Sequence, residues 1–398
     1  MNRKQFTLVL LALAIVGTAG IVLLKRDQRS WTTHEPGMGD KVLPNFRFND
    51  VAAIHVRSAA SDFNLARHDA IWVVRERGDY PANYQQIKDL LLKIKDLKVV
   101  RSESVGPSQL GRVDLEEPGK QSGGGTLLEF KDARGQLLDS LVVGKRHIRP
   151  QTESDPFRLH GLFDGCYVLT PRNPGNVLFI SDDLACAAPE SQAWLSREFF
   201  KLENIKSVSL VATNGANRWT ILRGNEAEPW TLTDLKPDDG ENLDPDSVSQ
   251  IGEVLGLLTF VDVIPKATPP SAETPGVRST AFWPPGTGLD KPMIALVETF
   301  EHLFHTLKIG GRDSKGNYHL AIGIRADLSA NPEAQDQAKK VTDKVARESR
   351  LAASGWVYLV ESHLIEPLIR ERAQLLRKKT IAGAQNPATK PAPPAFAQ

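Results

Sequence analysis

The sequence predicts an α+β protein in which an N-terminal transmembrane helix is followed by two tandem homologous units, each a mostly antiparallel sheet with one or two packed helices. Residues 6–24 form an apolar run without a charged side chain, which predicts the transmembrane helix. Short segments rich in β-branched and aromatic residues, separated by turn residues, predict the strands. The order of these segments occurs twice along the chain, which indicates an internal duplication.

The composition is that of a globular protein. The chain has 398 residues, which is long enough for two domains with cores of their own. It is 41% hydrophobic and 24% charged, and its formal net charge is +1. A charge so close to zero gives no global field that favours nucleic acid or a strongly acidic partner. Only two cysteines occur, so the chain is not a disulfide scaffold.

The membrane anchor is predicted at residues 1–26. A helix over residues 6–24 would be about 28 Å long at roughly 1.5 Å per residue, which matches the hydrocarbon core of a bilayer. The alternative is a cleaved signal peptide with a small-residue site at residues 17–19. The apolar run continues through residues 21–24, beyond that site, which favours an uncleaved anchor. Basic residues flank both ends and do not decide the orientation.

The other boundaries follow from composition and from the repeat. A single N-terminal span before a large body most often leaves that body outside the cytoplasm, and we expect this orientation here. The predicted segments are a polar linker at 27–43, a first α+β unit at 44–190, a second α+β unit at 191–380 and a disordered Pro/Ala-rich tail at 381–398.

The clearest repeated element is a helix. Residues 83–97 and 244–258 carry apolar side chains at the same spacing, i, i+3, i+7 and i+10, which places one apolar stripe on each helix. Asn83 and Asp244 each stand four residues before the first apolar residue, and both are favourable N-cap residues.

A three-strand meander is predicted before each helix. The two meanders begin with similar apolar patterns at Phe46 and Phe200. Each ends near a tryptophan, Trp72 in the first unit and Trp230 in the second, and we expect these to be core aromatics.

The predicted repeat continues after each helix. Leu-x-x-Pro segments close two long loops, and Val143-Gly144 matches Ile309-Gly310. The remaining elements are matched final strands at 166–169 and 356–359, closing helices at 191–202 and 364–377, and a polar, solvated helical insertion at 326–353.

No motif in the sequence predicts a catalytic constellation. His302 and His305 form an H-x-x-H pattern in a strand-like context, where residues i and i+3 face opposite sides and cannot share a metal ion. The glycine-rich points at 122–125 and 310–311 are predicted to be turns rather than phosphate-binding loops. The carboxylates at 238–246 lack the ligand order of a calcium loop and read as a solvated turn plus a helix cap. We therefore expect no catalytic, cofactor-binding or metal-binding residues.

Two groups of residues remain as candidates for other roles. Trp283, Pro284 and Pro285 lie in the second long loop and have no counterpart in the first unit, so they form a possible partner contact. Cys166 and Cys186 are a possible disulfide if the body lies outside the cytoplasm, and they are free thiols otherwise. The sequence leaves these two alternatives open.

The repeated features together resemble an uncharacterised bacterial family, known as a domain of unknown function, in which a duplicated α+β unit follows an N-terminal transmembrane helix. The resemblance rests on the repeated strand openings, Trp72 and Trp230, the two capped helices and the two Val/Ile-Gly pairs. Members of that family are often encoded beside ABC-transporter components of the gliding-motility type. The resemblance implies an accessory protein of an envelope complex rather than an enzyme, and it implies no catalytic residues. Together with the orientation expected above, the prediction is a single-pass inner-membrane protein with a periplasmic body.

The predicted function is therefore that of a non-enzymatic, membrane-anchored accessory protein of an envelope complex of the ABC-transporter type. Its expected partners are the lipid bilayer, through residues 6–24, and protein subunits of the complex, with no nucleic acid. The alternative is an extracytoplasmic module that binds a glycan or another polymer through exposed aromatic residues. An enzyme with a site assembled from dispersed residues is a third possibility.

Overall fold

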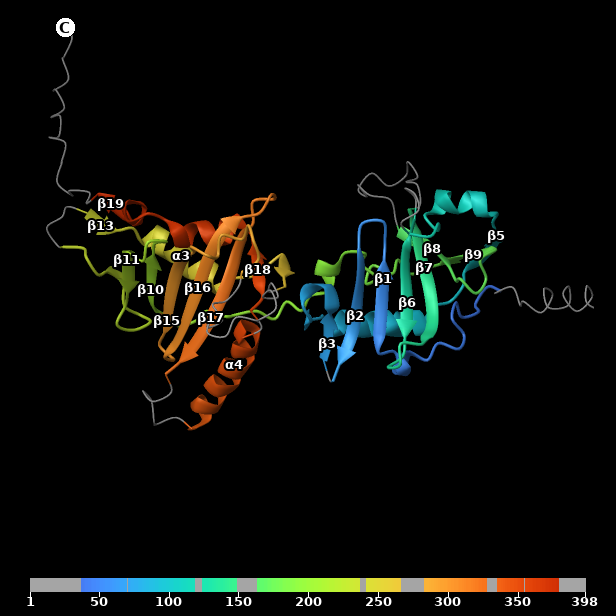
Figure 1. The fold of residues 1–398 in the computed structure, drawn as a ribbon, viewed down its shortest axis with the longest axis horizontal. Coiled ribbons are helices and arrows are strands. Elements are labelled where there is room, and N and C mark those ends of the chain that lie inside the picture. The colour runs from blue at the N-terminus through green and yellow to red at the C-terminus, as the bar shows by residue number, and fades with distance from the viewer. Residues whose placement is uncertain are drawn as a thin grey trace, which may run out of the picture. The chain divides into compact units, whose positions relative to one another are not determined.

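The computed structural model describes residues 37–69, 71–118, 124–148, 163–236, 241–265, 283–327, 335–353 and 355–378. The chain divides into two compact units, Met1–Ser196 and Arg197–Gln398. Each unit contains a mostly antiparallel sheet and few helices, so the predicted α+β class is confirmed (Figure 1).

The predicted transmembrane segment at 6–24 lies outside the described residues, as do the tail at 381–398 and most of the linker at 27–43. Among the helices that are described, none is long and apolar enough to cross a membrane.

The first unit is built on a sheet of nine strands in the order β4-β3-β2-β1-β6-β7-β8-β9-β5, in which neighbouring strands are antiparallel. The strands are β1 (Ala53–Arg57), β2 (Asp62–His68), β3 (Ile71–Val74), β4 (Tyr80–Pro81), β5 (Arg101–Ser104), β6 (Thr126–Lys131), β7 (Leu137–Ile148), β8 (Phe163–Leu169) and β9 (Asn176–Ile180).

One α-helix, α2 (Tyr84–Asp96), crosses behind this sheet in Figure 1. Its N-cap is Asn83, whose side chain accepts a hydrogen bond from Gln86 N at 3.3 Å. Ile87, Leu90 and Ile94 are buried, as the apolar spacing of the sequence predicts.

The second unit is built on a sheet of eight strands in the order β12-β11-β10-β15-β16-β17-β18-β14, with a separate pair, β13 and β19. The strands are β10 (Ile205–Val211), β11 (Asn217–Leu222), β12 (Thr231–Leu232), β13 (Glu241–Leu243), β14 (Asp262–Ile264), β15 (Met293–Thr299), β16 (Leu303–Arg312), β17 (Tyr318–Ala326), β18 (Val357–Val360) and β19 (Leu376–Lys378).

Three α-helices lie in the described part of the second unit. They are α3 (Pro245–Gly256), α4 (Gln335–Ala353) and the single turn α5 (Ser362–Ile365). Asp244 caps α3 by accepting a hydrogen bond from Ser247 N at 3.1 Å. The helix α4 packs against β17 (Figure 1).

The two sheets have the same strand order when β4, which has no partner strand in the second sheet, is set aside. The corresponding strands are β3 and β12, β2 and β11, β1 and β10, β6 and β15, β7 and β16, β8 and β17, β9 and β18, and β5 and β14. The predicted match of residues 166–169 with 356–359 is therefore wrong, because β8 takes the place of β17 rather than β18. A short connection joins β8 to β9, whereas α4 separates β17 from β18. Because of this difference, the predicted repeat left β9 and β17 unmatched.

The predicted closing helices are also wrong. Residues 191–202 contain only a 3-10 turn, Ser191–Trp194, followed by extended chain whose Ser196 N donates to Pro81 O. Residues 364–377 break into short turns and β19, and Pro367 lies at the first break. Proline lacks the amide hydrogen that a continuing helix needs.

In each sheet, a glycine allows a long loop to pass close over one face of the sheet. A Cβ atom on Gly144 would collide with Val113 O, and one on Gly310 would collide with Thr287 O. These approaches seat the leucines of the two Leu-x-x-Pro segments, Leu115 and Leu289, in small apolar clusters on that face. The prediction that residues 310–311 form a turn is wrong, because both glycines lie inside β16 and serve this close packing.

The insertion before β18 is less solvated than predicted. It does contain a helix, α4, but Glu348 of that helix is fully buried.

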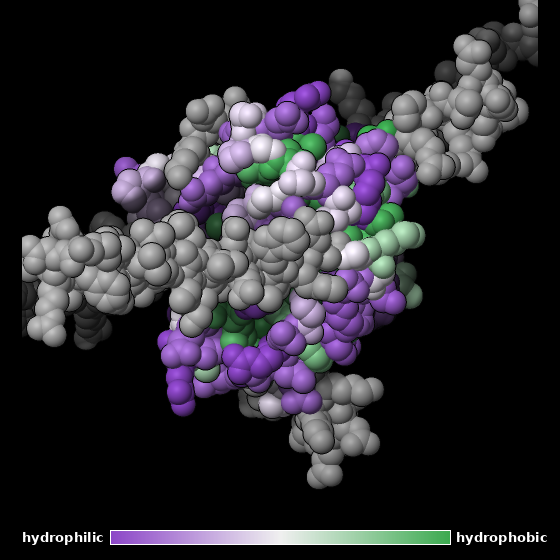
Figure 2. Space-filling view, turned by 90° about the vertical axis from the view of Figure 1, so that its right-hand side faces the viewer, coloured by the Kyte–Doolittle hydropathy of each residue, from purple (hydrophilic) through white to green (hydrophobic). Residues whose placement is uncertain are grey.

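The part of the molecule seen from the right-hand side of Figure 1 is mostly hydrophilic, and hydrophobic residues form only small patches on it (Figure 2).

Candidate binding grooves

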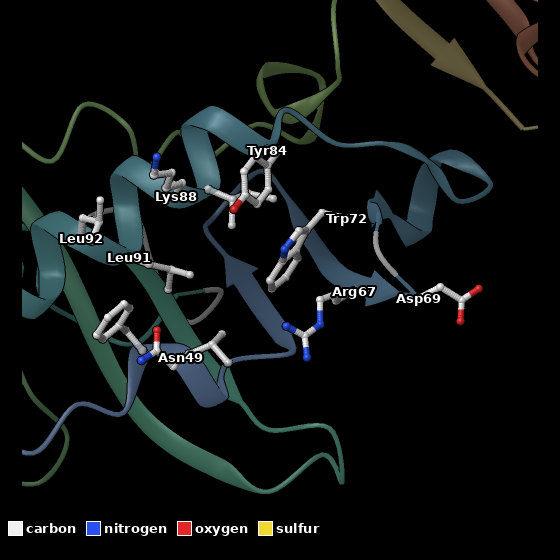
Figure 3. Close-up of a pocket in the computed structure, with 11 residues that line it drawn as sticks. Asn49, Arg67, Asp69, Trp72, Tyr84, Lys88, Leu91 and Leu92 are labelled. Atoms are coloured by element: carbon white, nitrogen blue, oxygen red, sulfur yellow. The ribbon is translucent and has the colours of Figure 1, made fainter. Parts of the chain in front are cut away.

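A hollow of the first unit lies between α2, the ends of β2 and β3, and the 3-10 turn Phe48–Asp50. Its volume is about 530 Å³. The residues that line it are Phe48, Asn49, Val51, Arg67, Asp69, Trp72, Tyr84, Ile87, Lys88, Leu91 and Leu92. We call it groove 1 (Figure 3).

The sheet pattern explains why Arg67 and Trp72 lie in this groove. Side chains alternate along β2, and Phe63 and Leu65 point into the core. Arg67 is the next residue on that face and is exposed. Trp72 is its register partner on β3 and is only 6% exposed, so it forms the floor of the groove.

Helix α2 forms one wall. Tyr84 is 61% exposed and Leu92 is 38% exposed, although both are large side chains on an otherwise amphipathic helix. Figure 3 shows Arg67, Trp72, Tyr84 and Leu91 bordering the same space, with Asp69 directed away from it. The groove thus combines an aromatic and aliphatic lining with a guanidinium group.

Groove 1 contains three hydrogen-bond donors that the rest of the unit does not use, beside the acceptor-bearing side chains of Asn49, Asp69 and Tyr84. Within the described residues, neither the Arg67 guanidinium nor the Lys88 ammonium makes a hydrogen bond or an ion pair. The Trp72 indole likewise has no acceptor there. By contrast, Trp194 Nε1 donates to Ala188 O and Trp219 Nε1 donates to Arg370 O, each at 2.8 Å.

The second unit has a hollow at the corresponding place, of about 610 Å³, which we call groove 2. Arg223 directly follows β11 and Trp230 directly precedes β12, so continuing the register of these strands places the two residues opposite each other, as Arg67 is opposite Trp72. The helix α3 forms its wall, as α2 does in groove 1. The lining residues are Leu202, Glu203, Asn204, Ile205, Arg223, Trp230, Val248, Ser249, Gly252, Glu253 and Gly256.

The arginine of groove 2 is occupied by the unit itself. Arg223 Nε donates to Ile205 O and Nη1 donates to Glu226 O, each at 2.8 Å. Its guanidinium carbon lies 4.8 Å from the Trp230 ring centroid and 5.7 Å from that of Phe300. The same framework therefore carries an engaged arginine in one unit and an available one in the other.

The predicted partner contact at Trp283, Pro284 and Pro285 lies in neither groove. Trp283 is half-buried beside the cluster of Leu289, Ala321 and Val357, and Lys308 Nζ lies 5.8 Å from its ring centroid. Pro285 is exposed. The role of this segment in partner binding stays a prediction.

Both cysteines are free thiols in the structure. Cys166 is buried, and its Sγ donates to Asp182 O at 3.2 Å. Burial raises the pKa of the Cys166 thiol to about 12 and also raises the pKa of Cys186. Neither group is therefore activated as a thiolate nucleophile.

The other sequence candidates are scattered. His302 lies in the turn before β16 rather than in the strand, with a positive φ of 57°. His305 is buried in β16, where its Nε2 lies 2.9 Å from Glu348 Oε2. Residues 238–240 of the acidic stretch lie outside the described part of the chain. Within the described ranges, no group of three His, Cys, Asp or Glu side chains could hold a metal ion.

Sequence reasoning missed the groove arginines as functional candidates. Arg67 and Arg223 end matching apolar strand patterns, each five or more residues before a matching tryptophan. The available signal was that, in both units, an arginine occupies the last inward-facing position of the strand pattern. No protein-family model, curated protein or solved structure matches the chain.

Proposed function

We propose that the protein is a non-enzymatic interaction protein, an accessory subunit that binds a protein partner in a bacterial envelope complex of the ABC-transporter type. The observation that carries this proposal is groove 1, an accessible hollow with an apolar lining and unengaged cations. Such a combination favours recognition of a partner's side chains.

The chemistry of groove 1 also favours binding over catalysis. The described residues that line it include no serine, cysteine or histidine, the side chains of the common pairs of nucleophile and base. Asp69 is its only carboxylate and points away from the space between Trp72 and Tyr84 (Figure 3).

We further propose that the two units are copies of one ancestral unit. The shared strand order, the capped helices at corresponding places and the loops that cross Gly144 and Gly310 support this origin. In this proposal residues 6–24 anchor the copies to the inner membrane and both lie on the periplasmic side.

The glycan-binding alternative has weaker support. Stacking against a sugar needs an exposed aromatic face, but Trp72 is buried, and Trp230 and Trp283 are only half-exposed. Tyr84 is the one widely exposed aromatic of groove 1.

The proposal is tested by co-purification of the tagged full-length chain from detergent-solubilised membranes. We expect transporter subunits to co-purify at a fixed ratio, and cysteine labelling of a residue in the second unit to place the body outside the cytoplasm. Recovery of the chain without any transporter subunit, under conditions that keep the transporter intact, would reject the proposal.

A further inference from the structure

We infer that groove 1 binds a short segment of a partner protein in which an acidic side chain is flanked by large aliphatic residues. This inference rests on the proposed function and adds the chemistry of the ligand. Groove 2, by the same reasoning, does not bind such a segment.

The two cations and the indole of groove 1 favour an acceptor, and the one carboxylate among the described lining residues, Asp69, is directed away from the space (Figure 3). Arg67, Lys88 and the Trp72 indole supply N–H groups and no acceptor atoms. A carboxylate offers two acceptor oxygens and a negative charge, and arginine pairs with it through two parallel hydrogen bonds. Charge complementarity therefore points to an Asp or Glu side chain facing Arg67.

The apolar surface around Arg67 selects the neighbours of that carboxylate. Tyr84 and Leu92 are exposed along the wall, and Leu91 and Trp72 border the space between them. Aliphatic residues on either side of the acid would cover these surfaces, whereas a sugar would leave its hydroxyl groups facing leucine side chains.

The dimensions fit a peptide rather than a small anion. Tyr84 and Leu92 are about 12 Å apart along α2, at roughly 1.5 Å of rise per residue. An extended chain covers that length in about four residues, at roughly 3.3 Å per residue. Four residues are enough to place one acid and two aliphatic side chains.

Groove 2 supplies the internal comparison. Its arginine is held by Ile205 O and Glu226 O and stacks on Trp230, so its donors are not available to a ligand. Two carboxylates, Glu203 and Glu253, also line groove 2 and would repel an acidic segment.

The test uses the full-length protein in detergent and calorimetric titration with the blocked peptide Ac-Ala-Leu-Glu-Leu-Ala-NH2. We expect the Glu peptide to bind about tenfold more tightly than its Gln analogue, because only the first can form a charged pair with Arg67. Arg67→Gln should remove this preference, so that the Glu and Gln peptides bind the variant with equal affinity.

Arg223→Gln is the matched control and should leave both affinities unchanged. Circular dichroism and thermal unfolding establish that each variant is folded. Three outcomes would overturn the inference: no binding of the Glu peptide, equal affinities for the Glu and Gln peptides, or an effect of Arg223→Gln as large as that of Arg67→Gln. Arg67-dependent binding of an oligogalacturonate in place of the peptide would overturn it as well.

This test is distinguishable from the test of the proposed function. If the wild-type chain co-purifies with transporter subunits but does not bind the peptide, the inference fails and the function stands. If the peptide binds with the expected dependence on Arg67 but no subunit co-purifies, the groove chemistry stands and the envelope-complex proposal fails.

Discussion

The first and second units place equivalent strands in the same order but put different charged residues at equivalent positions. Apolar residues, caps and close-packed glycines are shared. Asp139 in β7 corresponds to His305 in β16, since each follows the same register from the preceding strand. The framework is therefore set by packing, while the buried and groove-lining charges differ between the units.

The two buried titratable groups at this position, Asp139 and His305, pair with different residues. Asp139 is 4% exposed, and its Oδ2 lies 3.4 Å from Arg172 Nη2. Burial raises the pKa of the Asp139 carboxyl. His305 instead pairs with Glu348, and within the described residues His305 Nδ1 and Glu348 Oε1 have no hydrogen-bond partner. The His305–Glu348 pair is fully buried, whereas Arg172 is exposed.

The largest expected effect follows from breaking the His305–Glu348 pair. Glu348→Ala should lower the free energy of unfolding of the second unit by about 3–5 kcal/mol, because it leaves a polar imidazole buried without its partner. Urea unfolding of the full-length chain measures this loss. The double variant His305→Leu with Glu348→Leu should recover most of it, and a single-variant loss below about 1 kcal/mol would contradict the prediction.

The loop-crossing glycines should behave alike in the two units. Gly144→Ala and Gly310→Ala should each destabilise the protein by about 1–3 kcal/mol, because the new methyl group meets a backbone carbonyl. Gly252→Ala in α3 is the control, since open space surrounds it, and it should stabilise by about 0.5–1 kcal/mol. A tolerated substitution at only one of the two crossing positions would show that the loops are not held alike.

The groove arginines should differ in their structural role. Arg223→Gln should lower the free energy of unfolding by about 1–2 kcal/mol, because it removes hydrogen bonds and stacking on Trp230. Arg67→Gln should change it by less than about 0.5 kcal/mol. Denaturant unfolding of the two variants side by side tests this contrast, and equal losses would show that Arg67 is also engaged in folding.

The stabilisation from the helix cap should depend on pH in the second unit and not in the first. Asn83→Ala should lower the free energy of unfolding by about 1 kcal/mol at every pH, because an amide cap does not titrate. The hydrogen bond from Ser247 lowers the pKa of Asp244. The stabilisation from ionised Asp244 is therefore present above the ordinary Asp pKa and is lost as the pH falls through the lowered folded-state pKa.

Unfolding of wild type and Asp244→Asn between pH 2 and 7 measures this dependence. We expect the difference between them to be constant near neutral pH and to shrink in acid. A difference that grows as the pH falls would contradict the assignment.

Local patterns in the sequence predicted the parts of the fold that depend on local spacing. The two capped helices and the first strands of each unit are examples, since their apolar periods and caps are read directly from neighbouring residues. The match between β9 and β18 was missed because β9 pairs with β5, far away in sequence, and because α4 precedes β18.

The candidate site was harder to predict for a similar reason. Whether Arg67 is covered or exposed depends on how far α2 extends over the sheet, which is a tertiary property. Likewise Glu348 lies in a polar stretch that reads as solvated, and only the approach of His305 from β16 explains its burial.

The pairing of β13 with β19 sets the timing of folding during synthesis. The chain segment just before α3 is completed by Leu376–Lys378, and Asp244 N donates to Leu375 O at 2.8 Å. The second unit therefore cannot close until nearly its whole length has left the ribosome, whereas the first unit is complete by Ser196. At roughly 5–20 residues per second this gives the first unit a head start on the order of 10 to 40 s, so groove 1 can form before the second unit has been synthesised.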